Sequence, residues 1–289
     1  MVVGGLRSVQ SICQGLITPK EVETADTMQV EWIPASQGEN VAVTVPTLNN
    51  LLVDLKRHFQ EREGFCLATL NLDHVVKLRS DDAFRKAYAA HSHITADGNP
   101  IVWLCKLARR PVSLLSGADL IAPLAQLAGS MNVPVALLGS DEETLRTAAG
   151  KLEAQHEGLS VVACIAPPFG FDPESALAET YIAQLQEADV GLCFVALGAP
   201  KQEIFASHAT EAASRIGFVS IGAGIDFIAG TQTRAPAFMR LIAAEWLWRL
   251  ATNPKRFAGR YAACFLVLPS LLVSALKARR ANGHGKAQS

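Results

Sequence analysis

The 289-residue sequence lacks several patterns that would assign it to a class at once. Its six cysteines include no Cys-x-x-Cys pair, which argues against a zinc or disulfide framework and indicates small buried residues in a reducing compartment. A P-loop, a Gly-x-Ser-x-Gly motif and an Asp-x-Asp pair are also missing. The N-terminus has no continuous apolar segment typical of a secretory signal, so we expect a cytoplasmic protein.

Acidic residues are absent after Glu245, whereas the same stretch holds eight Lys and Arg residues. The rest of the chain has 18 basic against 27 acidic residues, so a formal net charge of −1 conceals an acidic body and a basic tail. Residues 262–276 form an apolar run shorter than the ~20 residues of a membrane span, and Pro269 interrupts it. We expect residues 253–289 to be a basic amphipathic appendage on an anionic membrane surface; an ordinary C-terminal core helix is the alternative.

Alternating apolar and amphipathic segments predict an α/β fold, Rossmann-like, with a mainly parallel sheet and helices on both faces. Residues 1–40 show no periodicity, and we expect a weakly ordered extension before a core at 41–252. The six strands are predicted at 65–70, 93–96, 133–138, 159–165, 190–197 and 216–221. The helices between them are predicted at 74–90, 100–108, 118–129, 142–155, 173–186 and 202–214, and a further helix runs from Pro236 to residue 252.

Polar and turn residues cluster just past the ends of these strands. Because parallel strands send their carboxyl ends to one edge of a sheet, we expect the residues to line one shared cleft. The candidates at this edge are Thr69, Asn71, Asp97, Gly139, Gly198, Lys201, Gln202, Glu203, Gly222 and Asp226.

Several of these residues also have a purely structural interpretation. Asp97 suits a general base, yet a turn aspartate that caps the next helix explains it equally well by local pattern. Lys201, Gln202 and Glu203 suit either ligand hydrogen bonds or the first turn of a helix, where the helix dipole favours Glu. Asp226 suits a ribose or base contact, or a turn cap.

Two further patterns are weak. The Gly222-Ala223-Gly224 turn is half of a dinucleotide fingerprint, lacks the third glycine and comes late in the chain. His91 and His93 form a His-x-His without a nearby third ligand, so we interpret them as structural and expect no metal or other cofactor.

A set of motifs resembles one known family. In order they are Thr69-x-Asn71, Ala96-Asp97-Gly98, Gly117-x-Asp119-Leu120, Leu138-Gly139, Gly170-Phe171, the run from Val195 to Glu203 (VALGAPKQE), Gly222-x-Gly224-x-Asp226-Phe227, Arg234-Ala235-Pro236, Glu245-Trp246-x-x-Arg249-Leu250, Pro254-x-Arg256 and Arg260-Tyr261. Their order and spacing over residues 41–261 resemble the WecG/TagA/CpsF glycosyltransferases, glycosyltransferase family 26.

The resemblance implies an inverting enzyme that transfers a sugar from a UDP-sugar to a polyprenyl-diphosphate-linked saccharide, in exopolysaccharide or envelope glycan synthesis. The protein would be peripheral on the inner face of the cell membrane. It implies Asp97 as the catalytic base with Thr69 as its partner, and Asn71, Gln202 and Asp226 in the nucleotide pocket. The basic appendage would close over the site and offer Arg256 and Arg260 to the diphosphate; we assign Arg234 to substrate binding as well.

Other functions remain open at this point. The main alternative is a non-catalytic nucleotide-binding regulatory module on the same fold, and the incomplete glycine motif disfavours an NAD(P) oxidoreductase. We expect no nucleic acid partner. The sequence leaves open the donor sugar, the acceptor saccharide and whether the chain forms a homo-oligomer.

Overall fold

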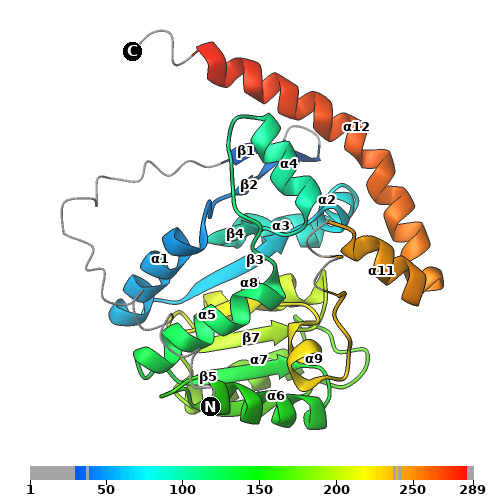
Figure 1. The fold of residues 1–289 in the computed structure, drawn as a ribbon. Coiled ribbons are helices and arrows are strands. Elements are labelled where there is room, and N and C mark those ends of the chain that lie inside the picture. The colour runs from blue at the N-terminus through cyan, green and yellow to red at the C-terminus, as the bar shows by residue number, and fades with distance from the viewer. Residues whose placement is uncertain (1–29, 37–38, 237–238, 240–242, 285–289) are drawn as a thin grey trace, which may run out of the picture.

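The computed structural model describes residues 30–36, 39–236, 239 and 243–284. Its centre is a six-stranded sheet in the order β4-β3-β8-β7-β5-β6, in which every pairing is parallel (Figure 1). All six predicted strands are confirmed. They are β3 (Phe65–Leu70), β4 (His93–Ala96), β5 (Val135–Gly139), β6 (Val161–Ile165), β7 (Leu192–Ala196) and β8 (Gly217–Ser220).

Helices cover both faces of this sheet, as predicted, because the central strands are apolar on both sides. One face packs against α1 (Leu48–Glu61), α5 (Gly117–Ser130), α6 (Glu142–Gln155) and α9 (Gly224–Ala229). The other face packs against α2 (Leu72–Leu78), α3 (Asp82–Ala90), α4 (Asn99–Leu107), α7 (Ala176–Glu187) and α8 (Lys201–Ala212). Leu67 and Ala68, neighbours in β3, lie in different core clusters for this reason.

Two helix predictions were wrong in their continuity. The segment predicted as one helix at 74–90 is two helices, because the side chain of Asp81 accepts a hydrogen bond from the backbone N–H of Phe84 and caps a new helix, α3. The helix predicted from Pro236 to residue 252 is not continuous either. Ala243 adopts a φ of 59°, which a right-handed helix does not contain, and α11 (Glu245–Thr252) begins two residues later.

The chain before the core contains a strand that the sequence analysis did not predict. Residues Val30–Ser36 form β1, which pairs antiparallel with β2 (Glu39–Val43) in a separate two-stranded sheet. Residues 30–36 were expected to be weakly ordered, and the structure shows instead that they form a strand paired to β2. Residues 1–29, which the same expectation covered, lie outside the described residues.

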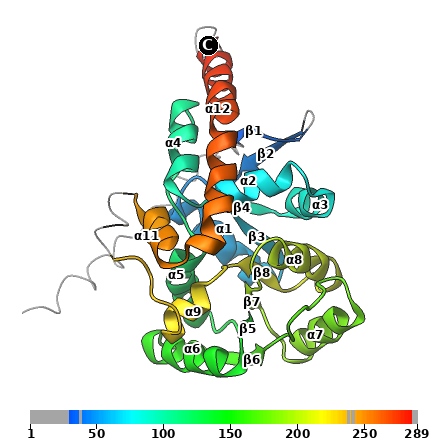
Figure 2. The ribbon, with the colours of Figure 1, turned by 90° about the vertical axis from the view of Figure 1, so that its right-hand side faces the viewer.

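The C-terminal appendage is one 31-residue helix, α12 (Pro254–His284), which projects past the body of the molecule (Figures 1 and 2). At 1.5 Å per residue it is ~46 Å long, and it continues through Pro269, where the sequence suggested an interruption. Cys264, Val267, Leu271 and Ala275 recur every three or four residues and are buried. This stripe packs against α2, α4 and β1.

The opposite side of α12 is apolar and exposed. Its exposed large side chains are Phe265, Leu266, Leu272, Val273 and Leu276. Residues Phe257–Ala281 are long and apolar enough to cross a membrane by length and composition, although 22% of an 18-residue apolar window within them is buried against the protein. Pro269 therefore does not limit the helix, and α12 combines a docked stripe with an apolar face directed away from the body.

A comparison of a buried and an exposed leucine of α12 tests whether the helix is docked on the body through its buried stripe. Leu271 is fully buried, so Leu271→Ala should lower the free energy of unfolding by about 2–5 kcal/mol through the cavity that it leaves. Leu266 is 83% exposed, and Leu266→Ala should change it by less than about 0.5 kcal/mol. Urea unfolding of both variants in detergent-free buffer measures the difference; equal effects would mean that α12 is not docked on this stripe.

Candidate active site

The carboxyl edge of the sheet brings Asp97 and Asn71 together. Asp97 follows β4, and its backbone N–H donates to the carbonyl oxygen of Leu70 at the end of β3, 2.8 Å away. Nδ2 of Asn71 donates to Oδ2 of Asp97 at 3.4 Å. Oδ1 of Asn71 meanwhile accepts from the backbone N–H of His74 and caps α2. The cap on α2 therefore fixes the orientation of the Asn71 side chain, and its Nδ2 donates to the carboxylate of Asp97.

The environment of Asp97 favours the protonated form more than water does. Burial raises the pKa of Asp97 to about 6, against the hydrogen bond from Asn71, which lowers it. The positive charge of Arg249 also lowers this pKa, whereas the negative charges of Glu245 and Asp119 raise it. A partly buried carboxylate with a pKa near neutrality suits proton transfer at physiological pH.

Two ion pairs lie near Asp97, and the sequence analysis assigned a role to only one of their four members. Nη1 of Arg234 lies 2.8 Å from Oδ1 of Asp119, and Nη2 of Arg249 lies 2.6 Å from Oε1 of Glu245. Nε of Arg234 is buried and has no hydrogen-bond partner among the described residues. The sequence analysis named Asp119, Glu245 and Arg249 only as members of family motifs. It could not predict that their charges would lie around Asp97.

A small cavity of about 150 Å³ lies where the segment after α9 meets α11 and the start of α12. Cationic, amide and aromatic side chains line it together, which suits a charged ligand with a planar ring. The lining residues are Phe227, Gln232, Thr233, Arg234, Ala235, Glu245, Trp248, Arg249, Thr252, Asn253 and Phe257.

Asp226 is the centre of a second polar group at the same edge. Its Oδ1 accepts from Oγ of Ser140, 2.8 Å away, and its Oδ2 accepts from Nε2 of Gln232, 2.7 Å away. Ser140 follows Gly139, whose φ is 116°; a Cβ there would lie 2.4 Å from the carbonyl oxygen of Ala196. Glycine at 139 thus allows the ends of β5 and β7 to approach and places Ser140 against Asp226.

The three polar residues that begin α8 turn inward to the protein. Nζ of Lys201 donates to the carbonyl oxygen of Phe171, 2.7 Å away. Gln202 is buried; its Oε1 accepts from the backbone N–H of Gly222, and its Nε2 donates to Oε1 of Glu203. These bonds join the loops after β6, β7 and β8, and both turn glycines, Gly198 and Gly222, have positive φ. The geometry gives Lys201 and Gln202 positioning roles; direct contact of Gln202 with a nucleotide stays a prediction.

Glu203 is fully buried, and its Oε2 has no hydrogen-bond partner among the described residues. Burial raises the pKa of Glu203 to about 7, and the hydrogen bond from Gln202 only partly offsets this. Substrate contact was predicted for this residue from the sequence. In the structure it is a core carboxyl beneath the loops of the site.

Arg260 of α12 reaches the site through an acidic residue of α2. Its Nε and Nη2 bond the two carboxylate oxygens of Asp73, at 3.1 and 2.6 Å, and Nζ of Lys77 lies 2.9 Å from Asp73 as well. Burial opposes ionisation of Asp73, but the hydrogen bonds from Arg260 and Lys77 lower its pKa. Asp73 therefore holds both cations, and the role predicted for Arg260 at a diphosphate is not tested by this arrangement.

The two remaining predicted residues differ in what the structure says of them. Thr69 is buried in β3, in register with Thr95 of β4, and within the described part of the chain its side chain makes no hydrogen bond to Asp97. The side chain of Arg256 lies outside the described residues, although its backbone belongs to α12.

A Rossmann-like sheet with a raised-pKa aspartate near its carboxyl edge is typical of α/β enzymes, and two nearby arginines suit an anionic substrate. Comparison with known proteins makes this specific: residues 38–284 match the glycosyl transferase WecG/TagA/CpsF family, and the chain belongs to it. It is similar to the N-acetylglucosaminyldiphosphoundecaprenol N-acetyl-beta-D-mannosaminyltransferase of Bacillus subtilis (strain 168), with 23% identity over 253 residues. That match covers 86% of this chain and 92% of the relative.

Replacing the buried carboxyl at 203 should stabilise the protein at alkaline pH. The unfolded chain loses this proton near the ordinary Glu pKa of ~4.3, whereas the folded chain keeps it to about 7. Folding stability from this group is therefore present below the unfolded pKa and is lost as pH rises to about 7. Glu203→Gln removes that loss, so it should be more stable than the wild type at pH 8, by an amount on the order of 3 kcal/mol.

The two proteins should differ far less at pH 5. Urea unfolding of both at pH 5 and pH 8 measures the change, because the wild type is its own control at acid pH. A gain from Glu203→Gln that is the same at both pH values would mean that the side chain is not held neutral by burial.

Proposed function

We propose that this glycosyltransferase is an inverting enzyme that uses a UDP-sugar and a polyprenyl-diphosphate-linked saccharide acceptor. The observation that carries the proposal is Asp97, a single carboxylate with a raised pKa at the mouth of the sheet, bonded to Asn71 and near two arginines. One base suffices for inversion when the leaving group is a diphosphate, because such a group departs without the acid that a glycosidase supplies.

In the proposed step, Asp97 accepts the proton of an acceptor hydroxyl as its oxygen attacks the anomeric carbon. The bond from that carbon to the diphosphate oxygen breaks on the opposite side, and UDP leaves with the electron pair. Negative charge then grows on the diphosphate, and fixed cations are the groups that stabilise it best. Arg234 and Arg249 are the described cations that line the adjacent cavity.

We assign the nucleotide to the region around Asp226. The Ser140 hydroxyl and the Gln232 amide already bond both carboxylate oxygens, so the carboxylate is fixed before a ribose hydroxyl arrives. Gln232 also lines the cavity that contains Arg234 and Arg249, which supports a nucleotide site beside the diphosphate site.

The acceptor assignment rests on the relative and on α12. The relative's name specifies a diphosphoundecaprenol carrier, and an enzyme that uses such a lipid must work at a membrane surface. We propose that α12 lies along the inner face of the cell membrane, because its docked stripe keeps one side on the protein while Leu266, Val273 and their neighbours remain exposed. Its C-terminal turns add Lys277, Arg279 and Arg280, which suit anionic lipid headgroups.

The role of Asp97 is tested by Asp97→Asn, which keeps the side-chain shape and removes the base. Turnover should fall by about 10²–10⁴-fold, the usual contribution of a general base, while UDP binding measured by calorimetry is unchanged. For the wild type, kcat/KM should fall tenfold per unit below pH about 6, since the base must be ionised. Turnover near the wild-type level in Asp97→Asn would exclude it as the base.

Membrane association is tested at the exposed face of α12. The double variant Leu266→Gln/Val273→Gln should reduce cosedimentation with vesicles that contain phosphatidylglycerol at least tenfold, because it removes apolar area that only a membrane would bury. Val53→Gln is the matched control, since Val53 is 57% exposed on α1. An unchanged vesicle-bound fraction in the double variant would contradict the assignment.

A further inference from the structure

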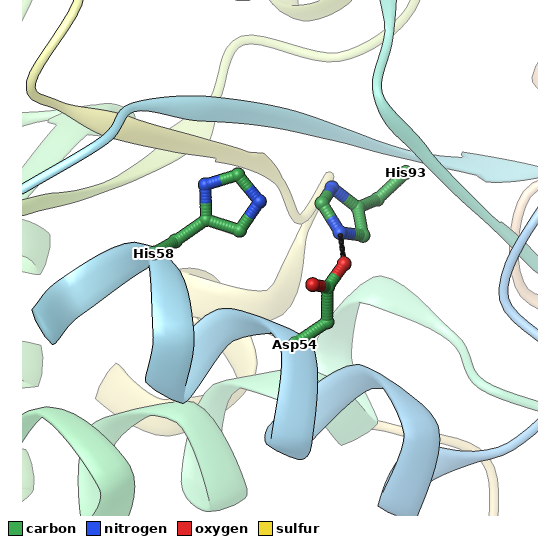
Figure 3. A group of neighbouring side chains, drawn as sticks. All are labelled: Asp54, His58 and His93. Carbon is green, nitrogen blue, oxygen red and sulfur yellow. Dashed lines mark hydrogen bonds and ion pairs between the residues drawn. The ribbon is translucent and has the colours of Figure 1, made fainter. Parts of the chain in front are cut away.

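A second cluster of ionisable side chains lies at the amino edge of the sheet. Asp54 and His58 come from α1, one helical turn apart on the same face, and His93 is the first residue of β4 (Figure 3). One nitrogen or oxygen atom of each lies within 4.8 Å of the others. The two histidines are buried and the Asp54 side chain is 45% exposed, so the cluster opens to solvent on the Asp54 side.

The hydrogen bonds around His58 fix its tautomer. Nδ1 lies 3.2 Å from the carbonyl oxygen of Glu63, which can only accept, so Nδ1 carries the proton. Nε2 lies 3.0 Å from Nη2 of Arg57, which can only donate, so Nε2 presents a lone pair. A histidine whose outer N–H is held by a carbonyl while the other nitrogen offers its lone pair to a cation is arranged as a metal ligand.

His93 is held the other way round. Its Nε2 lies 2.8 Å from Oδ2 of Asp54, which can only accept, so Nε2 carries a proton that a bound zinc ion would displace. Its Nδ1 lies 2.9 Å from Oγ of Ser92. Figure 3 shows both imidazole rings and the carboxylate directed at a common region. Two imidazole nitrogens and one carboxylate oxygen with an open fourth side form a donor set that suits zinc better than calcium or magnesium.

A protein cation already interacts with these donor atoms. Nη2 of Arg57 bonds both His58 Nε2 and Asp54 Oδ1, the latter at 3.1 Å. The Nη1 of the same side chain bonds Glu61 at 2.7 Å and Glu63 at 2.9 Å, and the side chain is 46% exposed. The guanidinium group can therefore leave the cluster and keep two of its ion pairs.

We propose that Asp54, His58 and His93 bind Zn²⁺ in place of the Arg57 guanidinium. Zinc bonds of ~2.0–2.2 Å in a tetrahedron put ligand atoms ~3.3 Å apart. Donor atoms that now lie up to 4.8 Å apart would therefore approach one another, whereas His93 Nε2 and Asp54 Oδ2, 2.8 Å apart, would separate slightly. The site is structural: Asp97 lies four positions after His93 along extended chain, ~13 Å away, and the ion would tie α1 to the strand that ends at the base. Of the His-x-His in the sequence, only His93 takes part, and α1 supplies the other two ligands, Asp54 and His58.

The experiment uses the full-length chain stripped of metal with EDTA, then titrated with Zn²⁺ against a chromogenic chelator and followed by thermal unfolding. Zinc should bind with one-to-one stoichiometry and raise the Tm in a concentration-dependent way, because the site exists only in the folded protein. Arg57→Gln should bind zinc at least tenfold more tightly, since it removes the competing cation. Asp54→Asn should bind it at least tenfold more weakly.

Two comparisons keep the result specific. His208→Gln is the matched control: His208 pairs with Glu179 at 2.5 Å outside the cluster, and its loss should leave zinc affinity unchanged. Circular dichroism without metal should show that Asp54→Asn is folded, and Co²⁺ should give a visible absorption band in the wild type that this variant lacks. The proposal is overturned if neither the wild type nor Arg57→Gln binds zinc, or if His208→Gln loses as much affinity as Asp54→Asn.

Discussion

The constraint on which this structure depends is that the strands of its sheet are buried on both faces. Such strands cannot carry charged side chains along their length without partners, so the chemistry is confined to their two ends. β4 shows this within five residues. His93 at its start belongs to a cluster of ionisable groups, and Asp97, just after its end, is the carboxyl group with the raised pKa. Ile94 and Ala96 between them belong to the core.

The long C-terminal helix is joined to the active site by one turn of α2. Arg260 of α12 bonds Asp73 in the first turn of α2, and Asn71 caps that same turn while it bonds Asp97. A displacement of α12 along its axis therefore pulls on Asp73, two residues after the Asn71 cap. In the proposed membrane-bound state, this turn is a route of hydrogen bonds that connects the surface helix to the base.

The sequence predicted the sheet well because each strand is a short apolar run bounded by turn residues, and burial alone dictates such runs. The sequence analysis missed the break at Asp81 because the residues around it fit one continuous amphipathic helix as well as two helices separated by a cap. For the site, position at a strand end was enough to select Asp97 and Asn71. Pairings across the chain were not predictable: Asp119 with Arg234 and Ser140 with Asp226 depend on loops whose approach only the folded chain defines.

Asp97 and Glu203 show why a raised pKa alone does not mark a base. Burial raises both, but Glu203 is fully enclosed, and only Asp97 is reachable by a substrate. A substrate can also change the pKa of Asp97, because the positive charge of Arg249 lowers that pKa and a bound anion would offset the charge. In the proposed reaction, a donor diphosphate that pairs with Arg249 cancels part of this positive charge. The pKa of Asp97 then rises, and the carboxylate becomes a stronger base at the stage when the acceptor hydroxyl must lose its proton.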